Sequence, residues 1–230
     1  MSSQINILFS AKSRVGLVNA AMFLGHNVAH VDINEHPILD VLAEHTPSVM
    51  FIKGDEWGRA VEKGVRKYGF KLIVDSTTDG EWSQHGTTVD IKPAADTTIF
   101  TPMKLDESMT KFMSEYSYIN APNRPDSLFV MKMCYPIGIY NVRVYNHPLS
   151  LVGQYSGRLS REQLPQVLIG STSIVTKDSD DELIYQIGAC KGHMELEDNS
   201  ILNDLPSDRN SLYDNIMEHH TYLHRLRELI

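Results

Sequence analysis

Charged side chains follow three of the apolar segments in the first half of the chain. Lys12 and Arg14 come after the first segment, Asp32 stands at the end of the second, and Asp75 directly follows the fourth. If these segments are parallel strands, ligands bind beyond their carboxyl ends. A carboxylate there can act as a general base, and a cation can meet an anion at a helix N-terminus. The alternatives are turn-capping carboxylates and solvated cations.

Other polar segments contain residue types that occur in metal sites or as catalytic nucleophiles. Asp178-Ser179-Asp180 follows a predicted strand, but such runs are ordinary turn or N-cap material. His220 and His224 are spaced to share a helix face, without an HExxH motif or a third ligand. Cys134 and Cys190 have no neighbouring histidine. We therefore expect no metal site and two packed thiols.

Strands and helices alternate along the first hundred residues. Helices are predicted from Ser13 to Gly25, after Pro37, and from Trp57 to Gly69. Apolar runs predict strands at residues 5–9, 28–33, 49–52, 72–74 and 98–100. Strands separated by helices form βαβ units, which are parallel with right-handed crossovers. The pattern predicts a Rossmann-like lobe.

The segment after the first strand does not fit a dinucleotide site. Residues 10–16 read SAKSRVG, without the three-glycine fingerprint, and the chain contains no GxxxxGK[ST] motif. Asp32 has the position of a ribose-binding acid, but a carboxylate that caps the next turn is the preferred interpretation. Assignment as an NAD-dependent enzyme would be supported by the fold alone.

The second half predicts a shorter series of elements. Strands are expected at Ser127–Met133, Tyr140–Tyr145 and Ser173–Val175, and a helix at Asp180–Ile187. A short helix should end at residue 168. One amphipathic helix should run from residue 207 to the end, with a seam formed by Leu212, Ile216, His219, Leu223 and Leu226.

Composition narrows the functional classes. The 230 residues carry a net charge of −8, which argues against coating nucleic acid by bulk charge. Two cysteines cannot build a disulfide framework. The N-terminus lacks a basic signal-peptide region, and no apolar run reaches the roughly 20 residues of a membrane span. We expect a soluble, cytoplasmic protein without a membrane partner. Its oligomeric state is left open.

Three segments carry recognisable motifs in a fixed order. Residues 21–28 read AMFLGHNV, residues 157–165 read GRLSREQLP ahead of Thr172–Val175, and residues 218–225 read EHHTYLHR. They resemble the "aLxxLGHeV", "G-x-[VL]-x-x-E-[EQ]-[LP]-P … [ST]-x-I-V" and "HTYxHR" stretches of GT-B glycosyltransferases. The closest resemblance is to the CgeB-like (spore maturation, glycosyltransferase-like) branch. Ala21 replaces the first leucine of the first motif.

The resemblance implies an α/β fold of two Rossmann-like lobes, the second reduced. Residues 1–103 would form the acceptor lobe, with Asp75 or Asp32 as general base. Residues 104–230 would bind a nucleotide sugar, UDP-linked or similar, without a metal or a tightly bound cofactor. Tyr222 and Arg225 would pack the final helix back against the lobes. Donor contacts would come from Arg143, Arg158, Lys177, Asp178, Gln186 and Lys191, among which Arg158 is preferred because it follows a glycine in a predicted loop before a helix. Each cation has a solvated surface charge as its alternative.

Two departures from the family leave other functions open. Gln186 stands where the family has an acid that grips the ribose, so the charge-assisted part of that hydrogen bond is lost. The chain is also short for two complete lobes. The alternatives are a non-catalytic nucleotide- or partner-binding protein and a nucleotide-sugar epimerase. A modified DNA base is one candidate acceptor, since residues 104–143 combine basic side chains with Phe112, Tyr116 and Tyr118.

Overall fold

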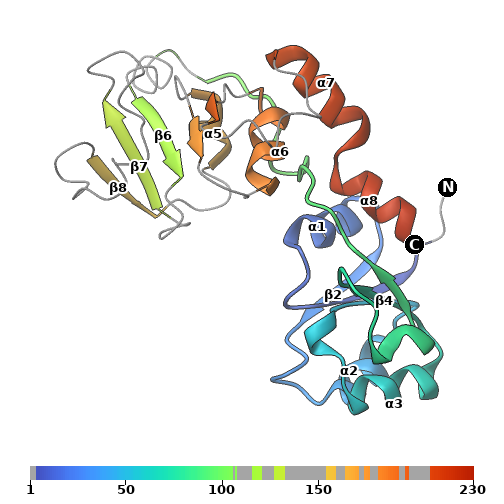
Figure 1. Ribbon diagram of the computed structural model, residues 1–230. Helices are drawn as coiled ribbons and strands as arrows, with labels where there is room; N and C mark the ends of the chain where they lie inside the picture. The colour runs from blue at the N-terminus through green and yellow to red at the C-terminus, as the bar shows by residue number, and fades with distance from the viewer. Residues whose placement is uncertain are drawn as a thin grey trace. The chain divides into compact units, whose positions relative to one another are not determined.

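The computed structural model (Figure 1) describes residues 4–105, 107, 116–120, 127–132, 154–158, 164–170, 174–176, 181–191, 195–196 and 208–230. The chain divides into two compact units. Unit 1 comprises Met1–Lys92 and Tyr222–Ile230, and unit 2 comprises Pro93–Thr221. Each unit is described by itself.

Unit 1 is an α/β fold around a five-stranded parallel sheet with strand order β2-β1-β3-β4-β5. Its strands are β1 (Asn6–Ser10), β2 (Asn27–Val31), β3 (Val49–Lys53), β4 (Lys71–Asp75) and β5 (Thr87–Val89). The intervening helices are α1 (Val15–Phe23), α2 (Ile38–His45) and α3 (Arg59–Tyr68), with short 3₁₀ turns η1 (Gly54–Glu56) and η2 (Glu81–Gln84). The Rossmann-like α/β fold and the first four strands are confirmed, because each central strand is an apolar run long enough to be buried on both faces.

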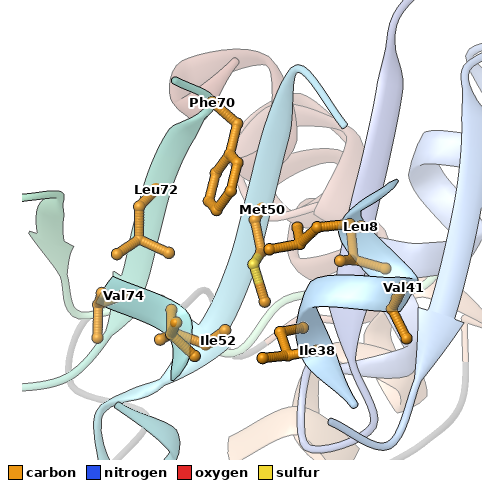
Figure 2. Close-up of a cluster of buried hydrophobic side chains, with 10 residues drawn as sticks. Leu8, Ile38, Val41, Met50, Ile52, Phe70, Leu72 and Val74 are labelled. Atoms are coloured by element: carbon orange, nitrogen blue, oxygen red, sulfur yellow. The ribbon is translucent and has the colours of Figure 1, made fainter. Parts of the chain in front are cut away.

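One face of this sheet packs against α2 and α3. Leu8, Met50 and Leu72 stand opposite one another in the register of β1, β3 and β4. They are joined in one buried cluster by side chains from neighbouring strands and helices (Figure 2): Ile38, Val41, Leu42, Ile52, Val61, Phe70 and Val74. Burying one such side chain contributes about 1.5–3 kcal/mol. On the opposite face Phe9 and Phe51 stack with ring centroids 4.7 Å apart.

The predicted fifth strand at residues 98–100 is wrong. The strand that pairs with β4 is β5, eleven residues earlier in the chain. Residues 97–99 form a turn, in which the Asp96 carboxylate accepts hydrogen bonds from the backbone N–H and the hydroxyl of Thr98. The Asp96 carbonyl accepts from the N–H groups of Ile99 and Phe100. A local aspartate that captures the backbone in this way outweighs the strand preference of threonine and isoleucine.

The C-terminal segment is two helices, so the single predicted helix is also wrong. Helix α7 (Arg209–His219) ends where His220 adopts φ −125° and ψ 43°, and α8 (Tyr222–Leu229) begins two residues later. Thr221, between them, forms a β-bridge with Ala95. The predicted seam is divided accordingly. Leu212 and Ile216 are buried in unit 2, Leu226 is buried in unit 1, and the His219 side chain is 56% exposed.

Helix α8 packs against α1 within unit 1. The Tyr222 ring is buried and lies directly against Gly16, where an added Cβ would be 2.1 Å from a ring carbon. Only glycine permits this approach. At the far end of α8, the Lys71 ammonium donates to the Leu229 carbonyl at 2.6 Å.

Unit 2 contains a mixed sheet with strand order β10-β9-β6-β7-β8. The strands are β6 (Tyr116–Asn120), β7 (Ser127–Lys132), β8 (Gln154–Arg158), β9 (Ile174–Thr176) and β10 (Glu195–Leu196), and the further helices are α5 (Leu164–Gly170) and α6 (Asp181–Ala189). Strand β7 runs antiparallel to both of its neighbours, unlike a strand in an all-parallel Rossmann sheet. The strand predicted at Tyr140–Tyr145 lies outside the described residues.

No helix within the described segments has the length and apolar character needed to cross a membrane.

Candidate functional site at the carboxyl edge of the unit-1 sheet

The carboxyl edge of the unit-1 sheet gathers the charged residues singled out in the first half of the sequence. Lys12 and Arg14 follow β1, Asp32 follows β2 and Asp75 ends β4. Arg14 and Asp75 line the same small hollow, together with Ser13, Leu17, Phe51, Ile52, Lys53 and Ile91. Its volume of about 10 Å³ accommodates roughly one water molecule. This hollow is therefore too small to hold a substrate.

Asp75 is held on both carboxylate oxygens. One oxygen pairs with the Lys53 ammonium at the end of β3, and the other accepts from the backbone N–H of Ile91 at 3.1 Å. The Asp75 side chain is only 12% exposed. These contacts join β3, β4 and the segment after β5, and they leave the carboxylate little capacity to accept a substrate proton.

Lys12 forms an exposed ion pair with Asp55, at 2.5 Å. The Asp55 hydrogen bond raises the pKa of Lys12, with smaller contributions from the charges of Glu56 and Asp32. The Lys12 hydrogen bond in turn lowers the pKa of Asp55. The two side chains are 47% and 66% exposed, so solvent screens the pair and its contribution to stability is small.

Asp32 caps the turn that follows β2. Its carboxylate accepts from the Asn34 N–H at 2.8 Å, and its carbonyl accepts from the N–H groups of Glu35 and His36. From the sequence we considered both a catalytic and a turn-capping role for Asp32, and these contacts are those of a turn cap.

Glu56 is the residue at this edge that the sequence analysis missed. It is 8% exposed, and its Oε2 accepts from the buried Ser10 hydroxyl at 2.6 Å and from the Lys53 N–H at 2.7 Å. Its Oε1 is buried and has no hydrogen-bond partner among the residues that the structure describes. The sequence did contain a signal for Glu56, because Asp55 and Glu56 closely follow β3. The same rule, that ligands bind beyond the carboxyl ends of parallel strands, had singled out Asp75 after β4.

Both tryptophans of the chain belong to segments that follow strands at this edge. Trp57 follows η1 and stacks on His85, with ring centroids 5.7 Å apart and an interplanar angle of 19°. Trp82 lies in η2, and its indole N–H donates to the Thr88 hydroxyl at 3.0 Å. Both rings are partly buried and pack against the hydrophobic cluster that contains Leu8, Met50 and Leu72.

The residues predicted to bind a donor in the second half are only partly described. Arg158 ends strand β8 instead of lying in a loop before a helix, so that basis for preferring it is lost. Lys191 has φ 57°, and its ammonium lies 4.5 Å from the centroid of the Tyr213 ring. Arg143, Lys177 and Asp178 lie outside the described residues.

Gln186 is buried at 3% exposure in unit 2. Its amide oxygen accepts from the Asp96 N–H at 3.0 Å, and its amide nitrogen donates to the Glu182 carboxylate at 3.2 Å. The amide therefore serves the internal structure of unit 2. A ribose hydroxyl could bind it only after these contacts rearranged.

Two of the metal and nucleophile patterns, Asp178-Ser179-Asp180 and Cys134, lie outside the described residues. In the part of the chain that is described, no group of three or more histidine, cysteine, aspartate or glutamate side chains is arranged to hold a metal ion. His220 lies outside both C-terminal helices, so it does not share a helix face with His224. Burial raises the pKa of the Cys190 thiol to about 12, which disfavours the nucleophilic thiolate.

A larger hollow lies at the opposite, amino edge of the unit-1 sheet. It has a volume of about 220 Å³ and is lined by Asn6, Ile7, Asn27, Val28, Ala29, Glu44, His45, Thr46 and Pro47. The two asparagine amides bond to each other at 2.9 Å. Ligands of open α/β sheets bind at the other edge, so size alone does not make this hollow the site.

Comparison of the chain with known protein families, with curated proteins and with solved structures gave no match.

Proposed function

We propose that this protein is a metal-independent glycosyltransferase of the GT-B type, which moves a sugar from a nucleotide sugar to a hydroxyl acceptor. The observation that carries the proposal is the packing of α8 in unit 1. The segment that resembles the family's "HTYxHR" motif leaves unit 2 at Thr221 and lays Tyr222 against Gly16 of α1. That return of the final helix is what the resemblance implies.

The carboxyl edge of the unit-1 sheet supports the same proposal. Transfer requires a positioned base for the acceptor hydroxyl and stabilisation of the departing diphosphate. In this proposal unit 1 binds the acceptor, since buried and paired carboxylates gather at its ligand-binding edge. Unit 2 binds the donor, with Lys191 and Arg158 as the cations proposed to contact the diphosphate.

Isothermal titration calorimetry tests the proposal. The full chain is titrated with UDP-, GDP- and dTDP-sugars, and circular dichroism verifies that it is folded. We expect saturable binding of at least one nucleotide sugar. A folded protein that binds none of them contradicts the proposal.

The Gln186 contacts favour a second candidate, a non-catalytic protein that binds a nucleotide or a partner. An amide fixed to Asp96 and Glu182 occupies the place of the family's ribose-binding acid. If a nucleotide sugar binds but is not consumed with any acceptor, and Gln186→Glu does not change this, the second candidate is the correct one.

A further inference from the structure

Glu56 has one carboxylate oxygen that the protein fixes and one that it leaves without a partner. Oε2 is fixed by the Ser10 hydroxyl and the Lys53 N–H, while Oε1 is buried without a hydrogen-bond partner in the described part of the chain. A buried polar atom in this state costs folding free energy relative to a satisfied one. Such atoms are rare in folded proteins and call for a specific explanation, among which a catalytic role is one.

The other carboxylates of the carboxyl edge do not combine these properties. Asp75 is occupied on both oxygens, Asp55 is exposed and paired with Lys12, and Asp32 caps its own turn. Glu56 alone among these four is more than nine-tenths buried and retains an oxygen free to accept.

We propose that Glu56 is the general base that deprotonates the acceptor hydroxyl, an inference that rests on the proposed glycosyltransferase function. The hydroxyl proton passes to Oε1, and the hydroxyl oxygen forms the new bond to the anomeric carbon. The bond from that carbon to the diphosphate breaks, and its electron pair leaves with the nucleoside diphosphate. Glu56 ends the step neutral and returns its proton to solvent, and no group is oxidised or reduced.

The Lys12–Asp55 pair lies near Glu56. The negative charge of Glu56 contributes to the raised pKa of Lys12, because the two side chains lie near each other. An exposed ion pair opens at a small free-energy cost. Ser10 and the Lys53 N–H hold Oε2, so the carboxylate keeps its orientation when an acceptor hydroxyl binds to Oε1.

The test variant is Glu56→Gln, because a glutamine amide oxygen can still accept from Ser10 and Lys53 but cannot take up a proton. Calorimetry with the nucleotide sugar that binds best measures donor affinity, and release of nucleoside diphosphate with water as acceptor measures turnover. We expect donor affinity to stay within about twofold and turnover to fall by about 10²–10⁴-fold. Glu56→Asp should retain part of the turnover. The matched control is Glu44→Gln, the same substitution at the amino edge, which should behave as the unaltered protein.

Three results overturn the inference. Turnover of Glu56→Gln equal to that of the unaltered protein excludes a base at this position. If the unaltered protein binds a nucleotide sugar but never hydrolyses it, there is no reaction in which Glu56 acts as the general base. If no nucleotide sugar binds at all, the failure is that of the proposed function, and calorimetry identifies it before turnover is measured.

The inference stays testable if Glu56→Gln does not fold. Glu56→Asp keeps a carboxylate at this position with a shorter reach, so kcat should fall while donor affinity stays within about twofold. A folded Glu56→Asp protein with the kcat of the unaltered protein contradicts the proposal.

Discussion

The two edges of the unit-1 sheet differ in what their polar groups are bonded to. At the amino edge, Asn27 donates to the Asn6 amide oxygen beside a hollow of about 220 Å³, and the buried Nδ1 of His26, directly before β2, has no hydrogen-bond partner in the described structure. At the carboxyl edge the hollow is only about 10 Å³, yet a buried carboxylate oxygen there lacks a partner in the described structure. Both edges therefore contain a buried polar atom without a partner in the described structure, but the atom at the carboxyl edge belongs to a carboxylate, which is the group that the proposed general base requires.

The largest stability effect is expected at Gly16, where α1 begins after the carboxyl end of β1. In Gly16→Ala the new Cβ would overlap the buried Tyr222 ring, which cannot move without displacing α8. We expect the free energy of unfolding in urea to fall by about 3 kcal/mol. Gly58→Ala is the control, because no atom lies within 4 Å of its added Cβ. Equal effects at the two glycines would contradict the packing of α8 on α1.

A pair of substitutions compares the two edges directly. Ser10→Ala removes a fully buried donor to Glu56 and should lower the free energy of unfolding by about 2 kcal/mol. Asn27→Ala removes exposed amide contacts at the amino edge and should cost less than about 0.5 kcal/mol. Chemical denaturation measures both. If Asn27→Ala cost as much as Ser10→Ala, the distinction between the edges would be lost.

The Asp75–Lys53 pair should contribute less. Asp75→Asn keeps an oxygen for the Ile91 N–H but removes the charge opposite Lys53, whose side chain is 30% exposed. We expect a loss of roughly 1 kcal/mol, reduced by solvent screening. A double-mutant cycle with Lys53→Met isolates the pairwise contribution. A coupling free energy of zero would show that the pair does not stabilise the edge.

The exposed Lys12–Asp55 pair should have the smallest effect, and its pH dependence has a defined sign. Because the pKa of Asp55 is lowered in the folded state, the contribution of this group is present above about pH 4 and is lost as the pH falls through the lowered value. The thermal midpoints of the unaltered protein and Asp55→Asn should differ slightly at pH 7 and converge near pH 2. A difference that grew on acidification would have the wrong sign.

The sequence predicted the elements whose physics is local. Runs such as Val49–Ile52 must be buried, so β1 to β4 and the α/β fold followed from hydrophobicity and spacing. Strand β5 was missed because Thr87–Val89 is short and half-polar, while the apolar residues 98–100 are held in a turn by Asp96.

The features that the sequence did not reveal depend on distant contacts. The break between α7 and α8 coincides with the bridge from Thr221 to Ala95. Glu56 acquires its environment from Ser10, which lies 46 residues earlier in the chain. Similarly, the contact of Gln186 with Asp96 spans 90 residues. Pattern and spacing along a single chain contain no information about such pairs.

A crystal structure of the full chain soaked with UDP tests the central claim most directly. If the protein is a GT-B-type glycosyltransferase, the diphosphate should lie against residues of unit 2, and the Glu56 carboxylate should stay clear of the nucleotide. A diphosphate bound instead at the N-terminus of α1 in unit 1, or crystals that bind no UDP at a concentration that saturates known nucleotide-sugar enzymes, would contradict the account.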